Sequence, residues 1–178
     1  MSSIVYLSKV SKITNAPLVL MLHGYSSNES DLFSFASLIP SDYHVVSLQA
    51  PLSLGMGYAW FPIHFEENME RWTSLEEAQH AIDYVTSFLT YYTEKNDVDA
   101  NNITLLGFSQ GAMLSYSVGL AHPNVSAIAA LSGYLDPRLV RFDNLNKTIY
   151  VSHGEQDVVV PYAWAAQSVA LLKENGYS

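Results

Sequence analysis

The strongest constraint on the fold is an uninterrupted apolar run of seven residues, Ala16–Leu22, which ends at His23 and Gly24. Both faces of an extended strand are apolar over this run, so the strand must be buried on both sides. Longer amphipathic stretches alternate with this run and with shorter strand-like runs at residues 4–10, 43–48, 102–106, 127–131 and 148–152. This alternation predicts an α/β fold with a mostly parallel sheet covered by helices, in a single domain over residues 1–178.

The expected helices follow from the spacing of apolar residues and from capping residues. The clearest one spans residues 75–95, where apolar side chains recur at spacings of three and four. Ser74 precedes it as a typical N-cap, and Glu77 stands at the capping-box position. Further helices are expected at residues 30–39, 112–121 and 161–174. Residues 51–71 contain glycines and prolines and are expected to form an irregular segment.

Composition excludes several classes of protein. Hydrophobic residues make up 49% and charged residues 14%, which excludes a disordered chain. The net charge of −9 would repel a phosphate backbone, so we expect no nucleic-acid partner. A bilayer span needs about twenty apolar residues, and the longest run here has seven, so no membrane insertion is expected. The chain has no cysteine and no apparent secretory signal, which favours a cytoplasmic location.

The segment Gly107–Gly111 reads Gly-Phe-Ser-Gln-Gly, the pattern of a sharp turn that exposes a nucleophilic serine. An apolar strand precedes it and an alanine-rich helix follows, which is the context that this turn requires. The turn would point the Ser109 hydroxyl outward at a helix N-terminus, where developing negative charge is favoured. The alternative is a glycine-rich turn in which Ser109 merely caps the helix.

A serine nucleophile needs a histidine base, and that base needs an orienting carboxylate. In this fold class the carboxylate follows the serine along the chain. Asp157 comes after the strand at residues 148–152, and Glu155 is its main rival for the role.

The negative oxygen of the reaction intermediate needs backbone N–H donors. We expect one from Gln110, directly after the serine, and one from Tyr25, in the loop after the Ala16–Leu22 strand. His23 and His153 stand at strand ends before glycines, and we interpret both as structural. No dinucleotide glycine pattern and no cluster of metal ligands stands out, so neither a cofactor nor a metal is expected.

Four segments together resemble the phospholipase/carboxylesterase family of α/β-hydrolases, which includes acyl-protein thioesterases and small bacterial carboxylesterases. They are Leu22–Tyr25, Gly57–Phe61, Gly107–Gly111 and His153–Pro161, and they occur in the family's order. The resemblance implies a serine esterase with Ser109 as nucleophile and Asp157 as the acid of the triad. It also implies Tyr25 and Gln110 as oxyanion donors, and Trp60 and Phe61 beside an acyl-binding groove. Its substrates would be small carboxylic esters or thioesters with short to medium acyl chains.

One departure from the family pattern concerns the base. In relatives a histidine follows the aspartate after one more strand, and a last helix closes the domain. Here 21 residues follow Asp157 and none is a histidine. We therefore expect the last strand and helix to be missing, which would leave an open sheet edge and favour a homodimer. The missing base also keeps open a catalytically silent binding module or an inactive truncated fragment. The motifs do not distinguish the esterase from a related hydrolase of the same fold that acts on peptides, lactones or acylated sugars.

Overall fold

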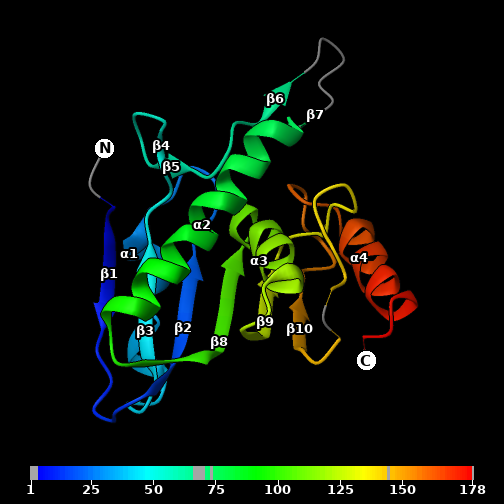
Figure 1. The fold of residues 1–178 in the computed structure, drawn as a ribbon. Coiled ribbons are helices and arrows are strands. Elements are labelled where there is room, and N and C mark those ends of the chain that lie inside the picture. Colours follow the sequence, from blue (N-terminus) through cyan, green and yellow to red (C-terminus); the bar gives the residue numbers. More distant parts are fainter. Residues whose placement is uncertain (1–3, 66–70, 73, 144, 178) are drawn as a thin grey trace.

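The computed structural model describes residues 4–65, 71–72, 74–143 and 145–177. Its centre is a six-stranded sheet with the order β1-β3-β2-β8-β9-β10 (Figure 1). The strands are β1 (Tyr6–Lys9), β2 (Ala16–Leu22), β3 (His44–Leu48), β8 (Val98–Phe108), β9 (Val125–Leu131) and β10 (Thr148–Ser152). β1 runs antiparallel to β3, and the other neighbours are parallel. The prediction of a mostly parallel α/β sheet is confirmed.

In the described part of the chain, four helices and a short 3-10 turn accompany the sheet. They are α1 (Glu29–Phe33), the turn η1 (Ala36–Leu38), α2 (Leu75–Lys95), α3 (Gln110–Ala121) and α4 (Tyr162–Glu174). The bounds expected for α2 are confirmed, and the Ser74 hydroxyl accepts the N–H of Glu77 at 3.4 Å. The helix expected over residues 30–39 begins one residue earlier, because Asn28 caps it, and it ends at Phe33, after which the chain tightens into η1.

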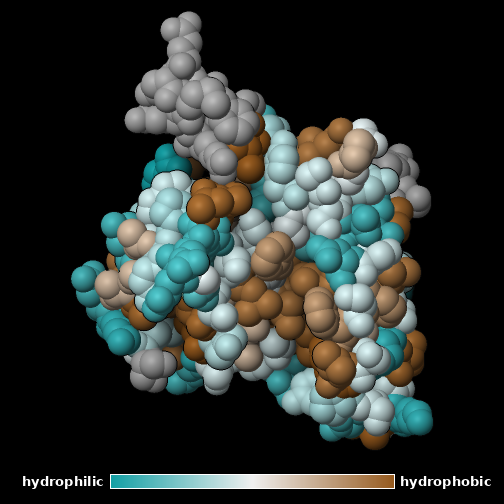
Figure 2. All heavy atoms as spheres, turned by 180° about the vertical axis from the view of Figure 1, so that it is seen from behind, coloured by the Kyte–Doolittle hydropathy of each residue, from teal (hydrophilic) through white to brown (hydrophobic). Residues whose placement is uncertain are grey.

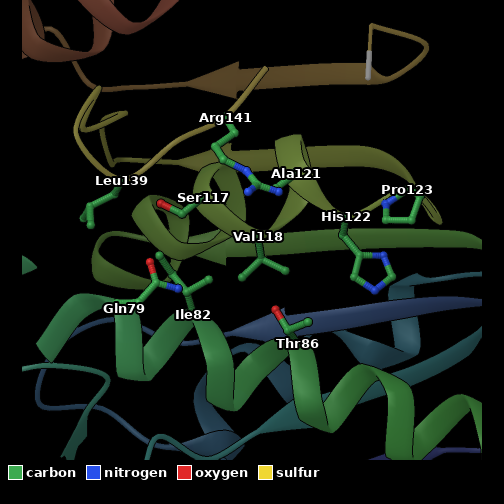
Figure 3. Close-up of a pocket in the computed structure, with 10 residues that line it drawn as sticks. All are labelled: Gln79, Ile82, Thr86, Ser117, Val118, Ala121, His122, Pro123, Leu139 and Arg141. Carbon is green, nitrogen blue, oxygen red and sulfur yellow. The ribbon is translucent and has the colours of Figure 1, made fainter. Parts of the chain in front are cut away.

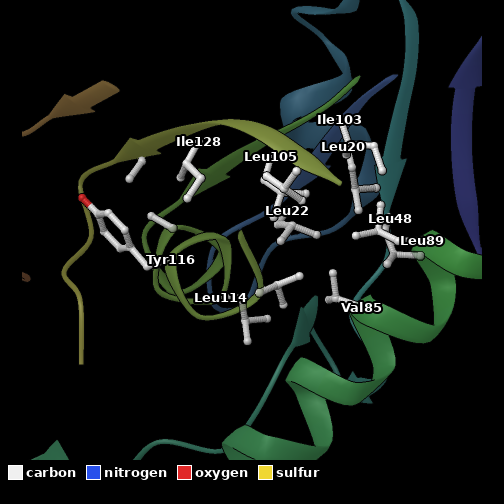
Figure 4. Close-up of a cluster of buried hydrophobic side chains, with 14 of the residues drawn as sticks. Leu20, Leu22, Leu48, Val85, Leu89, Ile103, Leu105, Leu114, Tyr116 and Ile128 are labelled. Carbon is white, nitrogen blue, oxygen red and sulfur yellow. The ribbon is translucent and has the colours of Figure 1, made fainter. Parts of the chain in front are cut away.

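The two faces of β2 enter different clusters of buried side chains. Leu18, Leu20 and Leu22 join the larger cluster, which includes residues of α2 and α3 (Figure 4). Val19 and Met21 point the other way, toward Leu32 of α1. The strand therefore has apolar neighbours on both faces, as its sequence requires.

Beyond α1, the back of the sheet exposes apolar surface. Strand alternation turns Phe108 of β8, Leu131 of β9 and Tyr150 of β10 to this face. Phe108 and Tyr150 are exposed, and brown hydrophobic surface gathers over the middle of this view (Figure 2). Of the described helices, the one that packs on this face is α1, and it contacts β2 and β3.

Residues 51–71 are more regular than expected. The segment β4 (Leu52–Ser53) pairs with β5 (Tyr58–Ala59), and β6 (His64–Phe65) pairs with β7 (Arg71–Trp72). Gly55 and Gly57 adopt φ values of 81°, which lets the chain reverse between β4 and β5. Residues 66–70 of the expected irregular segment lie outside the described residues.

Candidate active site

Ser109 occupies a strained turn between β8 and α3. Its backbone angles, φ 52° and ψ −114°, lie in a region that residues other than glycine rarely adopt. Its hydroxyl makes no capping hydrogen bond to α3, so the interpretation of Ser109 as a helix-capping serine is wrong. The hydroxyl instead stands at the N-terminus of a buried helix, where the helix dipole favours negative charge.

The glycines on either side of Ser109 are required by close backbone contacts. A Cβ atom on Gly107 would lie 2.2 Å from the carbonyl oxygen of Gly111. A Cβ atom on Gly111 would lie 1.9 Å from the carbonyl oxygen of Leu22. No side chain fits at either position, so the turn brings the start of α3 directly against the end of β2.

The two predicted oxyanion donors come from the loop after β2 and from the start of α3. A Cβ atom on Gly24 would lie 3.4 Å from the Cβ of Ser109, so this loop runs beside the serine. Among the residues that the structure describes, no acceptor is found for the N–H of Tyr25 or of Gln110. Both N–H groups are thus available to a ligand at this point.

His23 is fully buried and engaged at both ring nitrogens. Its Nε2 accepts the N–H of Ala50 at 3.1 Å, so the proton resides on Nδ1, which lies 2.8 Å from the carbonyl oxygen of Gly24 and donates to it. Burial lowers the pKa of His23 below 6.5, which favours this neutral form. The geometry agrees with a structural role and leaves no ring nitrogen free to act as a base.

Trp60 and Phe61 lie deeper than a groove wall would. Both side chains are only 1% exposed, so their predicted contact with an acyl chain stays a prediction. Their backbone groups are held by the buried side chain of Gln110, whose Oε1 accepts the Trp60 N–H at 3.0 Å. The Gln110 Nε2 donates to the carbonyl oxygen of Phe61 at 2.7 Å.

Asp157 has one carboxylate oxygen fixed and one available. Its Oδ1 accepts the N–H groups of Val159 at 2.8 Å and Val160 at 2.9 Å. The hydrogen bonds from Val160 and Val159 lower the pKa of Asp157, so the carboxylate is ionised at neutral pH. Its Oδ2 lies 3.5 Å from the Nε2 of His153. Glu155 is exposed and not held in this way, which makes Asp157 the better ordered of the two candidates.

In the described part of the chain, no imidazole is hydrogen-bonded to the Ser109 hydroxyl. The Nε2 of His153 bonds the carbonyl oxygen of Val160 at 2.8 Å, and its side chain is 2% exposed. His44 bonds the hydroxyl of Tyr92 at 2.7 Å, far from the turn on β3. The structure therefore places Ser109 directly before Gln110 and beside the loop that leads to Tyr25, but among the described imidazoles it identifies no base for the serine.

A separate cavity of about 330 Å³ lies between α2 and α3 (Figure 3). Gln79, Ile82 and Thr86 of α2 and Ser117 and Val118 of α3 line it. Val118 stands nine positions after Ser109 along α3, which at 1.5 Å per residue is a distance of about 13.5 Å. This cavity is therefore not part of the serine site.

Two contacts of the site were not anticipated from the sequence. The motif assigned Gln110 a role through its backbone, whereas its side chain also links α3 to Trp60 and Phe61. The contact between Ala50 and His23 spans 27 residues and has no local signal.

Within the described residues, no group of three or more potential ligands is placed to hold a metal ion. None of the described helices meets the length and hydropathy needed to span a bilayer.

A parallel sheet with a strained serine at the carboxyl end of a central strand is the arrangement of an α/β-hydrolase. The crystal structure of esterase PE8 has the same fold, with a TM-score of 0.82 and 28% sequence identity. The superposition covers 98% of this chain and 85% of that one.

The sequence model of the phospholipase/carboxylesterase family matches residues 8–177, and the chain belongs to this family. Acyl-protein thioesterase 1 of Mycosarcoma maydis is 30% identical, over 88% of this chain and 75% of the relative. Acyl-protein thioesterase 1 of Debaryomyces hansenii is 27% identical, over 71% of this chain. That match spans 59% of the D. hansenii protein, which is less than two thirds of its length.

Proposed function

We propose that this protein is a serine hydrolase that cleaves carboxylic esters through an acyl-enzyme on Ser109. The observation that carries the proposal is the strained turn at Ser109, whose hydroxyl stands at the N-terminus of α3 and makes no capping hydrogen bond to it. Strain of this kind persists where the surrounding structure holds it, and it is typical of functional sites. Membership of the phospholipase/carboxylesterase family supports the same class of reaction.

In the proposed first step, Ser109 Oγ attacks the carbonyl carbon of the ester while a base removes its proton. The N–H groups of Tyr25 and Gln110 bind the oxygen that becomes negative. The bond to the alcohol then breaks, and the alcohol leaves with the proton held by the base. In the second step water replaces the alcohol, the acid is released, and Ser109 regains its proton.

Asp157 is proposed to orient the base. Its Oδ1 is held by two backbone N–H groups, which leaves Oδ2 to accept a hydrogen bond from an imidazole. The base itself is the component that the described residues do not supply. The reaction therefore depends on a histidine other than the described imidazoles.

The proposed substrates are small, uncharged esters with short to medium acyl chains. The net charge of −9 disfavours anionic substrates and nucleic acid. The relatives named acyl-protein thioesterase 1 make thioesters the second class to test. The absence of cysteine supports a reducing compartment such as the cytoplasm as the place of action.

A catalytically silent binding module is the second candidate, because no described imidazole contacts Ser109. The two candidates differ in their reaction with a fluorophosphonate, which forms a covalent adduct only with an activated serine. For the esterase we expect an added mass on the Ser109 peptide and hydrolysis of p-nitrophenyl esters. Ser109→Ala should lose both, and equal hydrolysis by this variant would disprove the assignment. Ligand binding without any adduct would favour the silent module.

We also propose that two copies associate through the open edge at β10. The strand reads Thr-Ile-Tyr-Val-Ser and lacks the charges and prolines that commonly protect edge strands. Antiparallel pairing about Tyr150 would place Thr148 opposite Ser152 and Ile149 opposite Val151. Such a contact is self-complementary, as a two-fold symmetric dimer requires.

A further inference from the structure

We propose that the side chains of His23, Trp60 and Gln110 form one positioning unit that sets the direction of the Tyr25 N–H. This inference rests on the proposed function, because the Tyr25 N–H is one of its two oxyanion donors. All three side chains are buried, and none has a role of its own in the reaction described above. Their hydrogen bonds connect the turn at Ser109 to the loop after β2.

The first step of the argument concerns the peptide between Gly24 and Tyr25. This peptide is planar and trans, so its C=O and N–H groups point in opposite directions. The Gly24 carbonyl oxygen is held by two donors, the Nδ1 of His23 at 2.8 Å and the N–H of Ser27 at 3.2 Å. Because the carbonyl cannot turn without losing both, the Tyr25 N–H cannot turn either.

The tautomer of His23 makes the contact between its Nδ1 and the Gly24 carbonyl oxygen a favourable hydrogen bond. The N–H of Ala50 donates to Nε2 at 3.1 Å, which requires Nε2 to be without a proton and Nδ1 to carry one. A ring protonated at Nε2 would set two donors against each other. Burial lowers the pKa of His23, so the neutral ring with a proton on Nδ1 is the stable form.

Trp60 holds His23 from its other side. The two ring centroids are 5.2 Å apart, and the indole Nε1 donates to the carbonyl oxygen of His23 at 2.8 Å. Two consecutive carbonyl groups, those of His23 and Gly24, are therefore held before the chain reaches Tyr25. The loop enters the site with two peptide planes fixed.

Gln110 links this loop to the second oxyanion donor. Its own N–H is that donor, and its side chain bonds the N–H of Trp60 at 3.0 Å and the carbonyl of Phe61 at 2.7 Å. A shift of α3 would thus move Trp60 and, through it, His23. The two donors are coupled by side chains, although Tyr25 and Gln110 are far apart in sequence.

The test uses two replacements of His23 that each keep one of its contacts. His23→Asn places an amide nitrogen near the position of Nδ1 and retains the donor to Gly24. His23→Gln reaches the position of Nε2, retains the contact with Ala50 and loses the donor to Gly24. Losing one oxyanion donor lowers kcat by about 10²–10³-fold, so we expect a loss of about 100-fold in Gln and under about tenfold in Asn. KM for a p-nitrophenyl ester should change little in either variant, because the donor acts on the transition state.

A third variant and a control separate positioning from stability. Trp60→Phe keeps an aromatic ring at this position but removes the indole N–H that donates to the His23 carbonyl oxygen. We expect a loss of about tenfold in kcat. The control is His44→Gln, which removes a buried histidine bonded to Tyr92 and lies away from the turn. It should lower the unfolding temperature while leaving the rate unchanged.

A second readout does not depend on activity. In ¹⁵N-labelled protein, the ring nitrogen shifts of His23 report its tautomer, and the amide shift of Tyr25 reports the direction of the peptide. We expect the Tyr25 amide to shift in His23→Gln and to stay near its wild-type position in His23→Asn. If the wild type forms no adduct yet these shifts behave as expected, the proposed function fails and the positioning unit stands. Equal rates and equal Tyr25 shifts in the two His23 variants would overturn the positioning unit.

Discussion

A Cβ atom on Gly111 would lie 1.9 Å from the carbonyl oxygen of Leu22. This contact joins the first turn of α3, which carries the Gln110 donor, to the last residue of β2, from which the loop with the Tyr25 donor continues. Since a peptide oxygen in a central strand has little freedom to move, the separation of the two elements is set by the missing side chain.

Gly111→Ala should therefore destabilise the protein strongly. The added methyl must displace backbone, and we expect a loss of about 3 kcal/mol in the free energy of unfolding, the upper range for overpacking. Urea unfolding followed by circular dichroism measures it. Gly154→Ala is the matched control, because a Cβ there meets no atom within 4 Å. A similar stability for both variants would contradict the proposed packing.

The backbone strain at Ser109 predicts an inversion of the usual order of alanine and glycine. Elsewhere alanine is the more stabilising residue, because glycine loses more conformational freedom on folding. At φ 52° and ψ −114° the side chain is what strains the backbone. We expect Ser109→Gly to be more stable than Ser109→Ala by about 1 kcal/mol, measured by thermal unfolding of both variants. An Ala variant at least as stable as the Gly variant would show that the turn is not strained.

Asp157→Asn tests the proposed orientation of the base. Asparagine keeps an oxygen that can accept the N–H groups of Val159 and Val160, so the loop should stay folded. It loses the negative charge, and loss of a triad carboxylate lowers kcat by about 10⁴-fold where the base depends on it. Ester hydrolysis and the rate of fluorophosphonate labelling measure the effect. Glu155→Gln is the control and should leave both rates unchanged; the reverse pattern would assign the role to Glu155.

Stability should fall as the pH drops below about 6.5. Burial lowers the pKa values of three histidines, His23, His44 and His122, below 6.5. In that range the unfolded chain binds more protons than the folded one, so acid favours unfolding. Each histidine that stays neutral in the folded protein lowers the free energy of unfolding by up to about 1.4 kcal/mol for each pH unit below 6.5. Urea unfolding near pH 7.5 and 5.5 measures the slope. The slope should be smaller in His44→Gln, and a stability independent of pH would contradict the argument.

Part of this fold could be predicted because some elements carry a repeating signal. In α2, apolar residues recur over 21 positions behind the capping Ser74, so both ends were evident. In β2, continuous apolar residues on both faces required a buried strand. The serine turn was predictable because its glycines must stand at fixed positions around Ser109.

Other parts could not be predicted, because they depend on contacts between distant residues. The β4–β5 pair has two residues in each strand, too few for any periodicity. The first residues of β8 are largely polar and are drawn into the sheet by pairing at Ala16. The Gln110 side chain bonds Trp60, which lies 50 residues away in the sequence, and no local sequence pattern at either residue predicts the contact.

The open edge at β10 predicts a concentration-dependent dimer. Among the described residues no strand pairs with the outer side of β10, and backbone groups at the edge of an uncharged strand favour pairing. Tyr150, which is 61% exposed, adds apolar surface at the centre of the strand. We expect light scattering during size-exclusion chromatography to give about twice the mass of 19.7 kDa at high concentration. Tyr150→Lys should shift the protein to the monomer, because two lysines would face each other across the two-fold axis. Val10→Lys changes a similarly exposed apolar side chain just after β1, at the opposite edge of the sheet, and should leave the dimer intact. A monomer at every concentration would show that the edge is not a contact between copies.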